Sequence, residues 1–243
     1  MKLFKLLVLF TTLIVFADAA AAQTRRTQTR PTATTAIQTV SNADISSGLK
    51  DALFQGVRNA VNDLGRENGF LDDSRVRIPL PKSLQKVEKT LRFAGQGNRV
   101  DEFVEAMNRA AERAVPEATD VFLDSIRQMT FTDARNILFS GQDDAATQFF
   151  RRTSEARLRQ KFRPIVEEFT DEVGVTQKYK RMMGNYGFVG KLVGQDATDL
   201  DGYVTQKALD GLFLLVADEE RKIRRDPIGR TTNILRKVFG ILR

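Results

Sequence analysis

The chain has 243 residues, a hydrophobic fraction of 42% and a formal net charge of +7, and it contains neither cysteine nor histidine. This length and apolar content are sufficient for one domain with a sizeable core. Without Cys and His the protein cannot form disulfides, and it lacks the usual zinc and transition-metal ligands and the commonest general base. We therefore predict no metal site and no bound cofactor, and we assign no catalytic residue.

Residues 1–22 have the pattern of a secretory signal peptide. Lys2 and Lys5 precede a predominantly apolar run, and small residues follow it. The run is too short to span a bilayer comfortably. We predict cleavage after Ala22, with Ala19 as the alternative. The mature protein is then expected to be periplasmic or secreted, with no transmembrane segment.

The positive charge is concentrated at the two ends of the mature chain. Residues 221–243 contain eight Lys or Arg and one Asp, and residues 23–43 contain three Arg. Exported proteins rarely meet nucleic acid, and no aromatic residue is interleaved with the arginines of 23–43, so we expect no nucleic-acid partner. The basic ends favour either an anionic surface of the cell envelope as partner or a solvated basic face.

Residues 23–43 are rich in Thr and Arg and predict a disordered linker, whereas residues 44–243 predict a helical domain. In this domain apolar residues recur mainly at helical spacing, and no long alternating strand pattern occurs. The predicted fold class is therefore all-α, a single-domain bundle of several helices around a central apolar helix.

The first predicted helix begins at Asp44 and is followed by an extended segment at residues 76–81. In this segment Pro79 and Pro81 push the residues before them towards extended geometry. Apolar residues alternate there with polar or proline positions. We expect the segment to lie over a groove between helices, either as cover for the core or as the wall of a binding site.

Capping residues divide the next part of the chain into several helices. The longest of these helices contains Pro164, which is expected to kink or split it near Lys161. A glycine-rich apolar loop, residues 185–194, follows it. The predicted helix starts are Ser83, Asn98 with Asp101, Pro116, Thr130 with Asp133, and Asp143 with Asp144.

The central helix is predicted at residues 203–225, where apolar side chains nearly encircle the middle of the helix and must be covered on most sides. A last helix, residues 231–243, is basic and amphipathic. It could lie on a membrane surface, with Arg236 and Lys237 near lipid phosphates and Phe239 in the interface. Alternatively, its apolar residues join the core.

Several motifs in register resemble one known family. They are IPLPKSLQKVEKTLRFAGQG, VDEFVEAMNRAAERAVPEA, MTFTDARNIL, AATQFFRRT, VGVTQKYK, DGYVTQKALDGLF and RTTNILRKVFG. On these motifs the chain resembles the bacterial exported domain-of-unknown-function family 4197 over roughly residues 44–240. The resemblance implies an exported helical protein and supplies no activity or ligand.

Polar residues lie among apolar ones within these motifs. Because a buried charge is tolerated only when it is paired and hydrogen-bonded, one interpretation is a set of networks between helices. The other is a pocket for an anionic head group, with Arg109 and Arg152 as fork-shaped donors. The candidate ligand-binding residues are Asn108, Arg109, Arg152, Lys207, Asp210, Glu220 and Arg224.

The function predicted from the sequence is non-catalytic binding by an exported protein. The ligand would be apolar or amphiphilic, such as a lipid, or it would be a protein partner in the envelope. Two alternatives remain at this point: a structural envelope-associated scaffold with a basic C-terminus, and a hydrolase that uses paired carboxylates.

Overall fold

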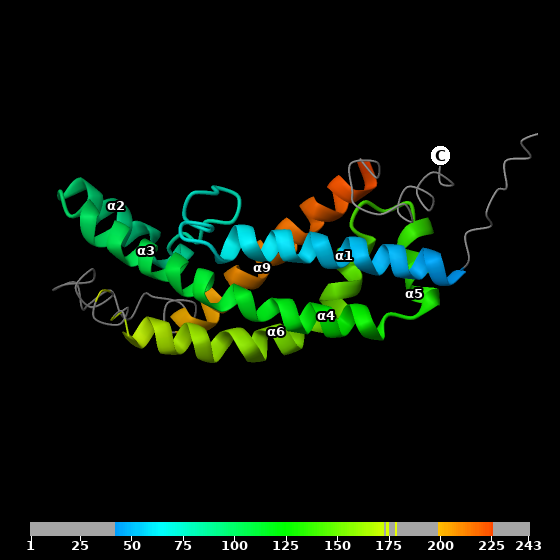
Figure 1. Ribbon diagram of the computed structural model, residues 1–243. Helices are drawn as coiled ribbons and strands as arrows, with labels where there is room; N and C mark the ends of the chain where they lie inside the picture. The colour runs from blue at the N-terminus through cyan, green and yellow to red at the C-terminus, as the bar shows by residue number, and fades with distance from the viewer. Residues whose placement is uncertain (1–41, 173, 175–177, 179–198, 226–243) are drawn as a thin grey trace, which may run out of the picture. The chain divides into compact units, whose positions relative to one another are not determined.

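The computed structural model describes residues 42–172, 174, 178 and 199–225, and the helices in these residues belong to one compact unit, Val40–Arg243. The described residues form α-helices and two short 3₁₀ helices, with no strand among them, so the predicted all-α, multi-helix fold is confirmed. The elements are α1 (Asn42–Gly65), η1 (Lys82–Leu84), α2 (Gln85–Phe93), α3 (Gly97–Ala114), η2 (Val115–Glu117), α4 (Ala118–Gln128), α5 (Phe131–Phe139), α6 (Ala145–Glu172) and α9 (Leu200–Arg225) (Figure 1).

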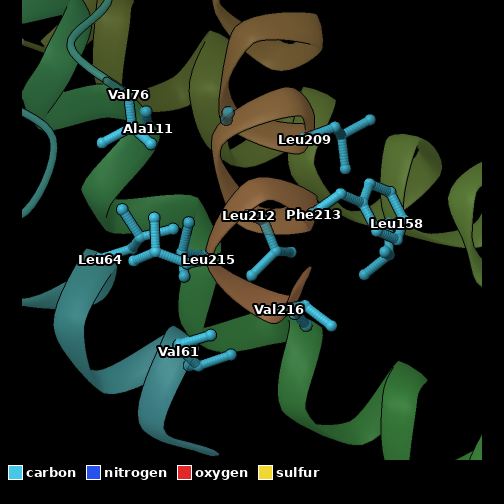
Figure 2. Packing of buried hydrophobic residues seen from close by; sticks show 14 of the residues in the cluster. Val61, Leu64, Val76, Ala111, Leu158, Leu209, Leu212, Phe213, Leu215 and Val216 are labelled. Carbon is cyan, nitrogen blue, oxygen red and sulfur yellow. The ribbon is translucent and has the colours of Figure 1, made fainter. Parts of the chain in front are cut away.

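Helix α9 packs against α1, α3 and α6. Figure 2 shows its buried side chains between α1, which contributes Val61 and Leu64, and α6, which contributes Leu158. The apolar run in the middle of α9 has side chains on nearly all sides of the helix, so contacts with several neighbours remove it from water. The neighbouring helices α1, α3 and α6 therefore cover the apolar side of α9.

Aromatic rings join three of these helices at the centre of the core. Phe122 of α4 makes edge contacts with Phe150 of α6, at 5.0 Å between ring centroids, and with Phe213 of α9, at 5.9 Å. Edge-to-face pairs at these separations are favourable beyond the apolar area that they bury.

As predicted, Pro116 lies in the first turn of the helix that continues into α4, and α6 begins directly after Asp143 and Asp144. Of the three other predicted starts, one is confirmed and two are wrong. Thr130 and Asp133 form a reciprocal capping box at the start of α5, as predicted. The prediction of Asn98 with Asp101 as the start of α3 is wrong, because the N-cap is Gln96 and no side chain caps the helix. Ser83 does not cap α2 either, since its hydroxyl has no hydrogen-bond partner.

Pro164 does not split the long helix, because α6 continues through it from Ala145 to Glu172. A proline removes one backbone donor. Fully buried Leu158, Phe162 and Val166 on either side of it hold the helix against the core. The loop 185–194, residues 1–41 and the predicted last helix with Arg236, Lys237 and Phe239 lie outside the described residues.

Candidate functional site

Residues 66–81, the cyan loop between α1 and α2 in Figure 1, contain an extended stretch that Asn108 of α3 fixes in place. The Ile78 N–H donates to Asn108 Oδ1 at 2.8 Å, and Asn108 Nδ2 donates to the Ile78 carbonyl at 2.9 Å. One amide side chain thus satisfies both backbone groups of Ile78, as a neighbouring strand would. Asn108 is fully buried, so it holds the loop and is not part of an open site.

Glu112, one turn further along α3, binds the start of the same loop. It accepts hydrogen bonds from the N–H of Phe70 at 3.2 Å and of Asn68 at 3.3 Å. Arg109 donates to Glu112 at 2.9 Å and to Glu67 at 2.9 Å. Arg109 therefore supports the carboxylate that holds this loop.

The extended stretch has a buried face and an exposed face. Val76, Ile78 and Leu80 are buried, whereas Arg77 and Pro79 between them are exposed. Successive side chains of an extended chain point to opposite sides, which explains the alternation. The stretch thereby covers part of the core and also presents a polar surface.

Helix α9 holds the exposed face of the stretch through two side chains. The Tyr203 hydroxyl donates to the Pro79 carbonyl at 3.0 Å. Arg75 donates to Asp218 of α9 at 2.6 Å and to Asp73 at 2.6 Å, and its hydrogen bonds lower the pKa of Asp73. The loop is therefore fixed from α3 on one side and from α9 on the other.

Three consecutive carboxylates of α9 bind three different parts of the protein. Successive helical residues point about 100° apart. Asp218 accordingly accepts from Arg75 of the loop, and Glu219 accepts from Asn59 of α1 at 2.8 Å. Glu220 accepts from the first turn of α6.

Glu220 caps the first turn of α6 from a different helix. Its two carboxylate oxygens accept from the N–H of Ala146 and of Thr147, each at 2.9 Å, and the Thr147 hydroxyl donates to it at 2.9 Å. A carboxylate at a helix N-terminus satisfies orphan N–H groups and interacts favourably with the helix dipole. Arg224 donates to Glu220 at 2.7 Å and to the Ile137 carbonyl at 3.0 Å, so these two predicted site residues form one network between α5, α6 and α9.

Two hollows lie along α9, bounded by residues 75–85 on one side and by α6 on the other. One has a volume of about 420 Å³ and is lined by residues between Arg75 and Pro79, the start of α6, and α9 from Lys207 to Arg221. The other has a volume of about 830 Å³ and lies on the opposite side of Pro79, near Tyr203. Both are lined by Pro79 and Lys207, so we treat them together as the α9 groove.

Basic side chains outnumber acidic ones in the lining of the α9 groove. Among the described residues that line it, only Asp144, Asp199 and Asp210 carry a carboxylate. The basic residues are Arg75, Arg77, Arg151 and Arg221 in the smaller hollow, Lys82, Arg159 and Arg163 in the larger hollow, and Lys207 in both.

Most of these cations already have a partner. Arg163 pairs with Glu167 at 2.7 Å, and Arg151 lies over the Phe213 ring at 4.4 Å from its centroid. Within the part of the chain that the structure describes, the side chains of Arg77 and Lys82 have no hydrogen-bond or ion-pair partner, and both are exposed. These two residues therefore carry the uncompensated positive charge of the groove, one in each hollow.

The predicted site residues fall into separate places. Lys207 and Asp210 lie in the α9 groove, where they approach each other at 3.9 Å. Arg152 lines a different hollow of about 150 Å³ beside α5, so the predicted pairing of Arg109 with Arg152 in one pocket does not occur. Asn108, Arg109, Glu220 and Arg224 belong to the networks that hold loops and helix ends together.

Arg77, Lys82 and Tyr203 are not among the site residues predicted from the sequence. A signal was present for Arg77, because the alternation at residues 76–80 places it on the face opposite the buried residues. No comparable signal existed for Tyr203, whose contact with Pro79 joins residues 124 positions apart.

No described helix is both long and apolar enough to cross a membrane. The described residues also contain no group of three or more acidic side chains placed to hold a metal ion. Neither a comparison with curated proteins nor one with solved structures finds a match to this chain. The sequence model of the family described as "Protein of unknown function (DUF4197)" matches residues 39–240, and the chain therefore belongs to this family.

Proposed function

We propose that this protein is a non-catalytic binding protein of the cell envelope, periplasmic or secreted, that holds an acidic group of its ligand in the α9 groove. The single observation that carries the proposal is the pair Arg77 and Lys82, two exposed cations without a partner among the described residues, in the wall of a groove whose charged lining residues are mostly Lys and Arg. The export part of the proposal depends on the signal-peptide pattern of residues 1–22.

The chemistry of the groove fits a carboxylate or phosphate. A guanidinium presents a planar fork of donors that matches either group. No described carboxylate is paired with Arg77 or Lys82, so an anion can bind them without breaking an existing ion pair. Both cations lie on a stretch that Asn108 and Tyr203 already fix, so little ordering of the backbone is required on binding.

The acidic residues of α9 support binding over hydrolysis. A carboxylate-dependent hydrolase needs a pair of acids that face one cleft. Asp218, Glu219 and Glu220 point to three different elements, and each accepts hydrogen bonds from the protein itself. Their positions suit a role in holding the fold together.

The proposal is tested with a rhodamine-labelled tetraglutamate probe, measured by fluorescence anisotropy at low salt with free dye as a blank. Replacing both cations, in Arg77→Gln/Lys82→Gln, should weaken binding about tenfold or more, because a hydrogen bond to a charged group contributes about 1.5–3 kcal/mol. Binding by the unchanged protein should also weaken as salt rises, since exposed charges are screened.

The matched control is Arg66→Gln/Lys89→Gln, which removes the same charge from two exposed residues outside the groove. This variant should bind the probe like the unchanged protein. Equal loss in both double variants would show that the probe responds only to net charge and would overturn the proposal.

A further inference from the structure

We infer that the ligand of the α9 groove is an extended acidic segment of a partner protein, with two carboxylates spaced so that one reaches Arg77 and the other reaches Lys82. This inference depends on the proposed function and specifies its ligand. Three features of the groove carry it: its length, the placement of its two unpaired cations, and the mixed chemistry of its lining.

The groove is long enough for a peptide. Its lining residues on α9 run from Gly202 to Arg221, which corresponds to about 29 Å along a helix at a rise of 1.5 Å per residue. An extended peptide advances about 3.3 Å per residue, so roughly nine residues would cover this length. A single head group would occupy only one of the two hollows.

The two unpaired cations are held apart. Arg77 lines only the smaller hollow and Lys82 only the larger one, with Pro79 between them in both linings. The backbone from residue 77 to 81 is extended, because the side chains of residues 77–80 alternate between exposed and buried and Pro81 has φ −50° and ψ 145°. At most about 17 Å separates their Cα atoms on this basis. A ligand that satisfies both cations therefore needs two separated acidic groups.

The rest of the lining favours a peptide over a uniformly charged polymer. Asp144, Asp199 and Asp210 would oppose a negative charge at every step along the groove, so a densely charged chain should bind more weakly than one with spaced carboxylates. Phe213 and Leu214 add apolar surface to the smaller hollow. An acidic segment with apolar residues between its carboxylates complements both features.

Two peptides of the same composition and charge test the inference. The first, Gly-Ser-Glu-Leu-Ser-Val-Glu-Leu-Ser, places its two glutamates four residues apart, about 13 Å in an extended chain. The second, Gly-Ser-Glu-Glu-Leu-Ser-Val-Leu-Ser, places them side by side. Each carries rhodamine at its N-terminus and an amide at its C-terminus, so that the two glutamates are the only carboxylates of the peptide. Binding is measured by anisotropy with the full mature chain.

The spaced peptide should bind about tenfold tighter than the adjacent one. In Arg77→Gln and in Lys82→Gln this preference should disappear, because one cation is then missing. Both side chains are exposed and unpaired in the described structure, so the variants should keep the circular dichroism spectrum and urea midpoint of the unchanged protein.

The possible failures have different meanings. Equal affinity for both peptides, lost in the Arg77→Gln/Lys82→Gln double variant, would overturn the two-point ligand and leave the proposed anion site standing. Stronger binding of inorganic tripolyphosphate than of the spaced peptide would overturn the choice of a peptide. If neither the peptides, tetraglutamate nor tripolyphosphate binds, the proposed function fails as well.

Discussion

Single polar side chains from α3 and α9 replace the hydrogen bonds that loops and helix ends cannot make for themselves. Asn108 pairs with both backbone groups of Ile78, and Glu112 accepts from the N–H of Phe70. Glu220 does the same for the first turn of α6. A buried donor without a partner destabilises the fold by about 1–3 kcal/mol. Each of these side chains therefore stabilises the fold by accepting hydrogen bonds from buried backbone N–H groups.

Glu220→Gln tests this role at the start of α6. The substitution keeps the shape of the side chain but turns one acceptor into a donor that faces the N–H groups of Ala146 and Thr147. We expect the free energy of unfolding in urea to fall by about 2 kcal/mol. Glu168→Gln, on the exposed face of the same α6 helix, is the control and should leave the free energy of unfolding unchanged. Equal midpoints for both variants would contradict the capping role.

At the scale of elements, the close approach of the extended stretch to α9 depends on Gly211. A Cβ at this position would lie 2.8 Å from Phe70 Cε1 and 3.2 Å from Val76 Cβ. Phe70 is fully buried, so its ring has little room to move. A glycine in the middle of α9 is therefore a packing requirement.

Gly211→Ala should destabilise the protein although alanine favours helix. The gain in helix propensity is about 1 kcal/mol, whereas overpacking a buried contact costs about 1–3 kcal/mol. We expect a net loss of about 1 kcal/mol in urea unfolding. Gly97→Ala is the control, because its nearest neighbour atom would lie at 3.5 Å, and it should be neutral or slightly stabilising. A more stable Gly211→Ala protein would refute the packing argument.

The capping box of α5 predicts a dependence of stability on pH. The hydroxyl and the N–H of Thr130 donate to Asp133 and hold its pKa below the ordinary value. A carboxyl group with a lowered folded-state pKa stabilises the fold above its unfolded pKa, and this contribution is lost as pH falls through the folded pKa.

The difference in unfolding free energy between the unchanged protein and Asp133→Ala should therefore be about 1 kcal/mol at pH 7 and should shrink towards pH 3. Urea unfolding at several pH values measures it. A difference that grows on acidification would have the wrong sign for this box.

At the scale of the whole molecule, the groove exists because three separate parts of the chain meet along α9. Residues 75–85 form one wall, α6 forms the other, and α9 lies between them. Other residues of α9, next to those that line the groove, are buried in the core where α9 packs on α1, α3 and α6. Core and site are thus two faces of one helix.

The compact unit Val40–Arg243 should fold without the residues before it. We expect a chain that starts at Val40 to have the same free energy of unfolding in urea, within about 0.5 kcal/mol, as one that starts at Gln23, because changes away from packed features have effects of this size. It should also bind the acidic probe equally well. A large loss of stability on this truncation would show that residues 23–39 belong to the folded core.

Much of the fold could be predicted from local patterns. Apolar spacing predicted the helical fold class, the Thr130 and Asp133 pair predicted the start of α5, and motifs in register predicted the family. These features depend on residues close together in sequence, where periodicity and capping act directly. The starts of α2 and α3 were mispredicted, because plausible capping residues were present but the backbone did not use them.

The sequence by itself determined the helical class, because helical spacing of apolar residues requires no knowledge of distant contacts. It also determined that buried polar residues such as Asn108 and Glu220 need partners, since an unpaired buried group is destabilising. Only the tertiary structure decided which partners those were and which cations remained unpaired. Glu220 binds residues 73 and 74 positions away, and Arg77 faces a groove whose other wall is α6. Such pairings depend on how the helices pack in three dimensions, and no local pattern in the chain specifies them.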